Sequence, residues 1–397
     1  MNERVAMQAA NPRIDGRSIY LDHHATTPVD PRVLEVAIRM MVEEYGNANG
    51  VENIHGEHAA RAVAEAKEQI ARSVSAEPDD VHFTSGSTEA IQLAISHAIA
   101  THRSPLRVAM TRVEHKAVID TVVKAERMGL VEKSWIAVDD KARLDWQSLE
   151  RVLDEGVDLV CVMAANNEVG TIYPVQKIAH AAREQGAGVL VDATQAIGRM
   201  ALDLDEGILD YVVLSAHKIY GPKGVGALIS PGFDRSSIYG LQGAHHPTPN
   251  VAGIAAMGRA CELMELEGAK ESGRLAMLRD RLQERLIALV PDLTVNGDKA
   301  SRLPHNLHFS AAGAPNEVVL SRLRGKLSIS SGSACNAGAQ EPSHVLRAMG
   351  LPDALLESCL RIGLGRSTTL GDVESAAILI GDAIHDVRMN FSGASHV

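Results

Sequence analysis

The residues on either side of Lys218 predict that this lysine is chemically reactive. It follows an apolar run, Tyr211–Leu214, typical of a buried strand in a parallel sheet, and precedes the turn sequence Gly-Pro-Lys-Gly at 221–224. A lysine amine removed from water at the end of such a strand loses its proton more readily and can form a Schiff base with an aldehyde. A surface lysine beside a tight turn explains the same residues, so the assignment depends on the rest of the chain.

A second group, Ser85–Thr88, separates a predicted strand from a predicted helix. The free N–H groups and the dipole at a helix start favour phosphate, and the Thr88 hydroxyl can add a hydrogen bond. An ordinary capped helix without a ligand explains the same residues. The chain has neither a Walker loop nor a G-x-G-x-x-G sequence after a strand, so the phosphate need not belong to a nucleotide.

Asp192 ends another predicted strand, Val189–Asp192. A carboxylate at this place can pair with a protonated pyridine nitrogen and make the ring a better electron sink, although a helix cap or a surface ion pair is also common. Asp192 and Lys218 are 218 − 192 = 26 residues apart, which leaves room for one βαβ step. The lysine, the carboxylate and the phosphate cup together describe a site for pyridoxal phosphate.

Of the four cysteines, Cys335 differs from the rest. It lies in a small, polar segment with glycines, Ser330–Gly338, which predicts an exposed thiol in a loop. Cys161, Cys261 and Cys359 have apolar neighbours and are typical of packing residues. No C-x-x-C pair is present, so we expect neither a zinc site, nor any other metal, nor a thioredoxin-like redox site.

Strand and helix patterns alternate from about residue 56 to residue 230, which predicts an α/β fold with a mostly parallel sheet and helices on both faces. The predicted helices are Gly56–Val74, Glu89–Ala100, Lys116–Met128 and Val175–Gln185, and the strands are Val81–Thr84, Leu106–Thr111, Asp158–Ala164, Val189–Asp192 and Tyr211–Leu214.

The length of 397 residues predicts two domains. A long connecting helix is expected at Val251–Gly268, followed by a second helix at Ser272–Leu289. We assign residues 16–257 to a large domain that binds the cofactor. Residues 258–397, together with the N-terminal segment 1–15, form a smaller α+β domain that carries the exposed cysteine.

Composition excludes some function classes. A net charge of −11 without a Lys/Arg run argues against direct nucleic-acid binding, and 3% aromatic residues argue against a stacking platform. No apolar stretch is long enough to span a bilayer, and residues 1–16 lack the apolar segment of a signal peptide. With 45% hydrophobic and 22% charged residues, the chain is expected to be a cytoplasmic enzyme.

The sequence resembles the cysteine desulfurases of the NifS/IscS type, in the class V aminotransferase group of pyridoxal phosphate enzymes. The resemblance covers nearly the whole chain in the family's order. Its motifs are Tyr20–Pro28, Phe83–Glu89, Glu114–Val118, Asn166–Gly170, Val191–Gly198, Ser215–Gly226, Ser330–Cys335, Glu341–Arg347 and Leu360–Arg366. It implies fold type I of the pyridoxal phosphate enzymes, a homodimer, and a mobile loop around the catalytic cysteine.

The resemblance also implies the catalytic residues. Lys218 would hold the cofactor as a Schiff base, and His115 would stack on its ring and move protons. Cys335 would attack the sulfur of L-cysteine, which leaves a persulfide on the enzyme and releases L-alanine. Arg361 would clamp the substrate carboxylate, to which its planar guanidinium is suited, and Asn167 would also contact the substrate.

The cofactor would have further contacts. Asp192 would pair with the ring nitrogen, while Gln195 and Asn167 would bind near the phenolic oxygen. The full set implied by the resemblance is Lys218, Ser87, Thr88, His115, Asn167, Asp192, Gln195, Ser215, His217 and Thr248, of which Ser87, Thr88, Ser215 and His217 would hold the phosphate.

One region departs from the family's pattern. The family has a stretch with a Glu and an Arg that reaches the phosphate of the neighbouring subunit, whereas Tyr239–Asn250 is shorter and lacks both. Thr248 is the residue left to supply a hydroxyl across the dimer. His245 and His246 are either replacements for the arginine or plain turn residues.

These features predict a cysteine desulfurase. A selenocysteine lyase or C–S lyase of the same fold is the alternative, and a catalytically silent scaffold for sulfur-trafficking partners is the rival from another class. The expected partners are L-cysteine, a second copy of the chain and a sulfur-acceptor protein. Iron–sulfur cluster assembly, tRNA thiolation, DNA phosphorothioation and a dedicated biosynthetic pathway all stay open as destinations.

Overall fold

The computed structural model describes residues 18–102, 105–200, 207, 209–239, 248–332 and 342–393. Cys335, His245 and His246 therefore lie outside the described residues. Within the described ranges, none of the helices combines the length and the apolar character needed to cross a membrane.

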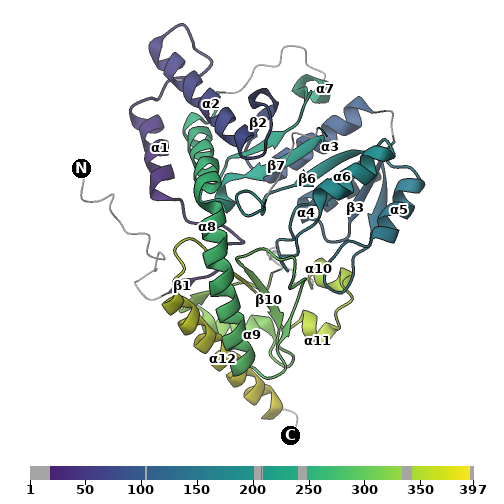
Figure 1. The fold of residues 1–397 in the computed structure, drawn as a ribbon, viewed down its shortest axis with the longest axis vertical. Coiled ribbons are helices and arrows are strands. Elements are labelled where there is room, and N and C mark those ends of the chain that lie inside the picture. Colours follow the sequence, from purple (N-terminus) through teal and green to yellow (C-terminus); the bar gives the residue numbers. More distant parts are fainter. Residues whose placement is uncertain are drawn as a thin grey trace.

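The large sheet has seven strands and confirms the predicted, mostly parallel architecture (Figure 1). Strand β8 is antiparallel to both of its neighbours, and the other pairs are parallel. In spatial order the strands are β2 (Val81–Thr84), β8 (Gly226–Ile229), β7 (Tyr211–Ser215), β6 (Gly188–Asp192), β5 (Leu159–Met163), β3 (Leu106–Thr111) and β4 (Val131–Ile136).

Helices cover both faces of this sheet. Side chains alternate along a strand, so Leu159 and Cys161 of β5 face one hydrophobic cluster while Val160 and Val162 face another. The first cluster is covered by α3 (Ser87–Thr101) and α4 (Lys116–Arg127), and α7 (Arg235–Tyr239) packs on α3. The second is covered by α2 (Ile54–Arg72), α5 (Trp146–Asp154), α6 (Val175–Glu184) and the first part of α8 (Val251–Leu289).

Helix α8 runs without a break along the length of the molecule (Figure 1). The prediction of two helices, separated between Gly268 and Ser272, is therefore wrong. Gly268 does not end a helix, because its role is close packing: a Cβ there would lie 2.2 Å from the carbonyl oxygen of Gly198. Beside α8 lies α1 (Pro31–Val42), whose first turn is capped by the Asp30 carboxylate.

The C-terminal part is built on a smaller antiparallel sheet in the order β12-β10-β9, next to a two-stranded parallel sheet, β1-β11. Its own hydrophobic cluster includes Leu282 of α8 and Phe309. The elements are β1 (Ile19–Tyr20), β9 (Thr294–Val295), β10 (Asn306–Ser310), α9 (Asn316–Leu323), β11 (Leu327–Ser328), α10 (His344–Ala348), α11 (Asp353–Leu356), β12 (Cys359–Gly363) and α12 (Leu370–Gly393); short 3-10 turns cover Pro78–Asp80 and Ala216–Lys218. The domain division at 257/258 stays a proposal. Along α8, the hydrophobic cluster of the large sheet extends to Met264 and the cluster of the small sheet begins at Leu275.

Candidate active site

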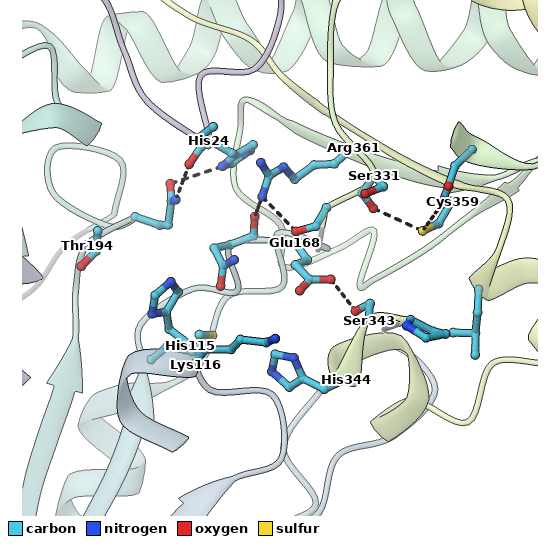
Figure 2. A pocket seen from close by; sticks show the side chains of 18 of the residues that line it. His24, His115, Lys116, Glu168, Thr194, Ser331, Ser343, His344, Cys359 and Arg361 are labelled. Atoms are coloured by element: carbon cyan, nitrogen blue, oxygen red, sulfur yellow. Dashed lines mark hydrogen bonds between the residues drawn. The ribbon is translucent and has the colours of Figure 1, made fainter. Parts of the chain in front are cut away.

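A cavity of about 1080 Å³ lies between the carboxyl ends of the large-sheet strands and the smaller sheet. Side chains from both parts of the chain surround it (Figure 2). The structure brings most of the predicted site residues together here, namely Ser87, Thr88, His115, Asn167, Asp192, Gln195, His217, Lys218 and Arg361.

Lys218 ends the 3-10 turn that follows β7 and faces the cavity. Its amine donates to the carbonyl oxygens of His24, at 2.5 Å, and Ala25, at 2.9 Å. Burial, and then the nearby positive charge of Arg361, lower the pKa of Lys218 to about 8. The amine is therefore neutral, and nucleophilic, in a much larger fraction of molecules than an ordinary lysine at the same pH.

The predicted anion cup falls at the junction of β2 and α3. Helix α3 begins at Ser87, so the N–H groups of Ser87 and Thr88 have no partner earlier in the helix. Gly226 of β8 allows the junction to approach the sheet, because a Cβ there would lie 2.7 Å from the Cα of Gly86. Ser215, buried at the end of β7, lies on the same side: a Cβ on Gly86 would be 3.8 Å from its Oγ.

Asp192, at the end of β6, and His115, just before α4, both line the cavity. Asp192 is 7% exposed and accepts a 3.0 Å hydrogen bond from the backbone N–H of Thr194. His115 Nδ1 accepts from the N–H of Ala117 at 3.1 Å, which places the proton of the neutral ring on Nε2. Burial lowers the pKa of His115, so this neutral form prevails at neutral pH.

Directly beside His115, Glu114 is fully buried behind the cavity. Its Oε1 accepts from the Thr111 hydroxyl at 2.6 Å and from the N–H of Met163 at 3.0 Å. Burial raises the pKa of Glu114 to about 8, so the carboxyl group is neutral at pH 7. The sequence contained this residue in a family motif, but gave no sign that it would be uncharged.

Gln195 is held in place by His24, a residue to which sequence reasoning assigned no role. His24 Nδ1 donates to Gln195 Oε1, and Gln195 Nε2 donates to the carbonyl oxygen of His24, both at 3.2 Å. The other ring nitrogen of His24 accepts from the amide of Asn306 at 3.1 Å, and the ring stacks on His305 at 4.3 Å. The Asp-His-His sequence at 22–24 was the only available signal for this contact.

Arg361 enters the cavity from β12 (Figure 2). Its Nη1 donates to the carbonyl oxygen of Asn167 at 2.9 Å, and its Nη2 pairs with the Asp22 carboxylate at 3.0 Å. The same Asp22 oxygen accepts from the Ser330 hydroxyl at 3.2 Å. Sequence reasoning missed Asp22, whose carboxylate fixes the direction of the guanidinium.

Further contacts fix the two backbone segments on either side of residues 333–341. After them, the Ser343 hydroxyl donates to Glu168 at 2.5 Å, and His344 Nε2 donates to the carbonyl oxygen of Glu114 at 2.9 Å. Before them, the Cys359 thiol donates to the carbonyl oxygen of Ser331 at 3.2 Å. Burial raises the pKa of Cys359 to about 11, so this thiol, which lines the cavity, stays protonated.

The other predicted residues, His217, Thr248 and Cys335, differ in their relation to the cavity. The ring of His217 bonds to the Thr26 hydroxyl at 3.1 Å, and burial lowers its pKa to about 4, so it is neutral. Thr248 precedes α8 and is not among the residues that line the cavity. Cys335 lies outside the described residues, but Gly332 and Pro342, which flank residues 333–341, both line the cavity.

The donor set fits a phosphorylated pyridine aldehyde. An amine of lowered pKa, the start of a helix, a buried carboxylate and a flat neutral imidazole all line one cavity. Such a set can bind an aldehyde, a phosphate and a protonated ring nitrogen at once.

Known proteins resemble this chain over nearly all of its length. The model of the family "Aminotransferase class-V" matches residues 19–375. A protein of Anaeromyxobacter sp. (strain Fw109-5) named cysteine desulfurase IscS is 40% identical over 378 residues, which is 93% of each chain. Among solved structures, a NifS-like protein has 30% identity and a TM-score of 0.83 and covers 93% of this chain and 99% of its own. A structure described as SspA in complex with cysteine has 27% identity and a TM-score of 0.73, covering 88% and 99%.

Proposed function

The chain belongs to the class-V aminotransferase family, and we propose that it acts there as a cysteine desulfurase that moves sulfur from L-cysteine onto Cys335. The observation on which this proposal rests is the convergence of Lys218 and Arg361 on one cavity from two different sheets. An amino acid offers an amine and a carboxylate, and these two residues suit the two ends of such a substrate.

Members of this family use pyridoxal phosphate, which, when bound, supplies an electron sink for the carbon next to the substrate amine. Lys218 would hold its aldehyde, and Asp192 its ring nitrogen. Ser87, Thr88, Ser215 and His217 would hold the phosphate, Gln195 and Asn167 would lie near the phenolic oxygen, and His115 would stack on the ring. Thr248 would reach the cofactor of a second subunit.

The residues of the cavity divide the remaining tasks. Arg361 binds the substrate carboxylate through the guanidinium N–H groups that Asp22 and the Asn167 carbonyl leave free, and so sets the direction of the bond to be broken. The neutral Lys218 amine accepts the proton from the substrate's α-carbon, and the neutral His115 can exchange a proton at Nε2. Glu114, uncharged at pH 7, adds no negative charge beside Asp192.

Cys335 performs the sulfur step. Its thiolate attacks the sulfur of L-cysteine, so an S–S bond forms while the C–S bond breaks, and the electron pair of the broken bond stays with the carbon fragment. Protonation of that fragment gives L-alanine, and the second sulfur stays on the enzyme as a persulfide. No outside oxidant is needed, because the substrate carbon is reduced as the two sulfurs join. An acceptor protein or a thiol then takes the terminal sulfur.

The test is the release of sulfide and alanine from L-cysteine with a thiol reductant, for the wild type and Cys335→Ala. We expect equal amounts of both products from the wild type, and bound cofactor without either product in the variant. Cys261→Ala, which removes a thiol buried in α8 away from the cavity, is the matched control and is expected to keep the activity.

Other outcomes would favour the alternatives. Products that persist in Cys335→Ala would mean elimination without a persulfide, as in a C–S lyase. A strong preference for selenocysteine over cysteine would indicate a selenocysteine lyase. A wild-type protein that binds no pyridoxal phosphate would point to the silent scaffold.

A homodimer is part of the proposal, and the surface of α1 supports it. Leu34, Ile38, Met41 and Val42 form one stripe of this helix and are 48%, 51%, 65% and 67% exposed. A row of large apolar side chains on one helix face is typical of a buried interface. The sulfur acceptor is proposed to be a protein, with iron–sulfur cluster assembly as one of its routes.

A further inference from the structure

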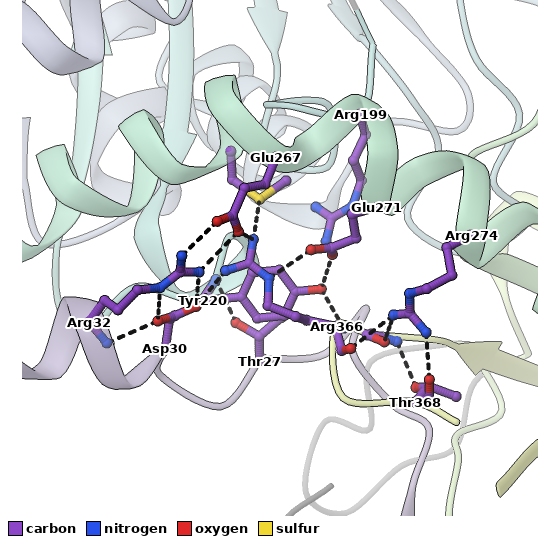
Figure 3. Close-up of polar contacts among 12 residues, drawn as sticks. Thr27, Asp30, Arg32, Arg199, Tyr220, Glu267, Glu271, Arg274, Arg366 and Thr368 are labelled. Carbon is purple, nitrogen blue, oxygen red and sulfur yellow. Dashed lines mark hydrogen bonds and ion pairs between the residues drawn. The ribbon is translucent and has the colours of Figure 1, made fainter. Parts of the chain in front are cut away.

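Arg366 occupies a polar cluster at the junction of the large and small sheets, outside the cavity (Figure 3). Its guanidinium donates to Glu271 at 2.7 Å and to Asp30 at 2.5 Å, and lies 3.7 Å from the carboxylate of Glu267. It also lies over the ring of Tyr220, 4.4 Å from the ring centre. One side chain thus contacts α8, the start of α1 and the turn after β7.

Tyr220 is held equally firmly. Its hydroxyl donates to Glu271 at 2.5 Å and accepts the backbone N–H of Arg366 at 2.9 Å, so the phenol and the guanidinium share one carboxylate. Its own backbone N–H donates to the Thr27 hydroxyl at 2.8 Å. Tyr220 is 3% exposed and has a φ of 64°, which is rare for a non-glycine residue. Its hydrogen bonds hold the backbone in this unfavourable conformation.

The two residues connect the two halves of the cavity. Tyr220 comes two positions after Lys218, and Arg366 comes five positions after Arg361. Arg274 of α8 fixes the Arg366 segment independently of Tyr220, because it donates to the carbonyl oxygens of Gly365, Arg366 and Thr368. The Tyr220–Arg366 contact is thus a direct bond between the segment that follows Lys218 and the segment that follows β12, the strand of Arg361.

The buried ion pairs of this cluster restrict the movement of its residues. The Asp30 and Glu271 side chains are 4% and 8% exposed, so both carboxylates depend on their cationic partners. In such surroundings charge-assisted hydrogen bonds are short and directional, and loss of a partner leaves a costly unpaired group. Arg32, which pairs with Asp30 and Glu267, forms the more exposed end of the same cluster.

We propose that Tyr220, Arg366 and Glu271 are positioning residues that set the separation between Lys218 and Arg361, and with it the fit of the substrate amino acid. The proposal rests on the proposed function, in which Lys218 serves the amine end and Arg361 the carboxylate end. Loosening the contact moves the carboxylate clamp relative to the lysine but removes no group from the cavity. The effect therefore falls on KM for L-cysteine more than on kcat.

The experiment uses the dimeric holoenzyme and three variants. Tyr220→Phe keeps the ring and removes only the hydroxyl, and Arg366→Lys keeps the charge but loses the planar fork. Arg281→Gln is the matched control, because Arg281 also forms an ion pair that joins α8 to another element, to Glu374 of α12 at 2.6 Å, but on an exposed surface. Alanine formation gives KM and kcat, and hydrogen exchange of the cofactor-free protein gives the mobility of residues 217–221 and 363–369.

In Tyr220→Phe we expect KM to rise about tenfold with kcat within about twofold, since one hydrogen bond to a charged group is of this size. Exchange should increase in both segments, although only one contains the substitution. Arg366→Lys should also raise KM with little change in kcat, and its KM should exceed that of Tyr220→Phe. Arg281→Gln should match the wild type in both the kinetics and the hydrogen exchange.

Two results would overturn the proposal. One is a Tyr220→Phe enzyme with unchanged KM and faster exchange only around residue 220, which is what a purely local packing role predicts. The other is an equal rise of KM in Arg281→Gln, which would mean a general loss of stability. A wild-type enzyme without alanine formation would instead refute the proposed function, and the exchange data of the cofactor-free protein would still test the mechanical link.

Discussion

At the scale of single residues, the site depends on groups held in unusual protonation states. Lys218 is a base whose pKa burial lowers to about 8, and Glu114 is an acid whose pKa burial raises to about 8. Both groups are therefore nearer to neutrality at pH 7 than their types suggest. The residue types were readable from the sequence, but these states depend on burial that only the fold provides.

The lysine gives a pH prediction. Pyridoxal phosphate uptake by the cofactor-free protein needs the neutral amine of Lys218, so below pH 8 the rate should fall about tenfold per pH unit and should level off above it. Absorbance of the bound cofactor, followed in time, measures this rate. In Arg361→Gln the loss of a nearby positive charge should move the break to higher pH. A break that stays in place in this variant would mean that Arg361 does not affect the lysine.

The predicted site residues were found mainly by their place at strand ends. Lys218 and Asp192 follow buried strands that are neighbours in the sheet, so their convergence could be predicted from the chain. His24 and Asp22 could not be placed in this way, since they reach the site across separations of 171 and 339 positions to Gln195 and Arg361. Contacts between residues so far apart in the sequence are set by tertiary packing rather than by a local pattern.

At the scale of elements, two strands of the large sheet were predicted with their observed bounds. Val81–Thr84 and Leu106–Thr111 form strands with the predicted bounds. The edge strand Val131–Ile136 was missed, because its polar residues Glu132, Lys133 and Ser134 hide the alternation. The prediction failed again within α8, where a glycine that serves packing was interpreted as a helix end.

Two glycines of α8 give a matched pair of predictions. Gly268→Ala places a methyl group against the backbone of Gly198 and should lower the free energy of unfolding by about 1–3 kcal/mol. Gly273→Ala meets no atom within 4 Å and should raise it by about 0.5–1 kcal/mol through helix propensity. Chemical denaturation measures both values. Equal effects of the two substitutions would contradict the packing role of Gly268.

At the scale of the whole molecule, α1 directs an apolar stripe outward from the large domain. Further exposed apolar residues lie just after it, at Tyr45, Val51 and Ile54. Single exposed apolar residues need no explanation, but several on one helix face support the proposed contact with a second copy of the chain. Residues 239–250 lack the arginine of the family's pattern. In the proposed dimer, Thr248 would therefore be the residue that reaches the cofactor of the other subunit.

The dimer can be tested on this stripe. The double substitution Ile38→Glu with Met41→Glu places two charges in the proposed interface and should convert the dimer to monomers, because unpaired charges are costly to bury. Light scattering during gel filtration measures the mass. Met128→Glu, at a side chain 63% exposed beyond α4, is the control and should leave the mass unchanged. Doubly substituted protein that still has the mass of two chains would exclude this face of α1 from the interface.

The pairing of β1 with β11 has a consequence for how the protein is made. Ile19 pairs with Leu327, 327 − 19 = 308 positions later, so at about 5–20 residues per second the ribosome delivers the partner about 15–60 s after the first strand. Through that interval β1 lacks its partner strand. A chain that ends between Lys218 and Leu327 therefore contains the lysine but lacks both Arg361 and the strand that pairs with β1, so it cannot assemble the site.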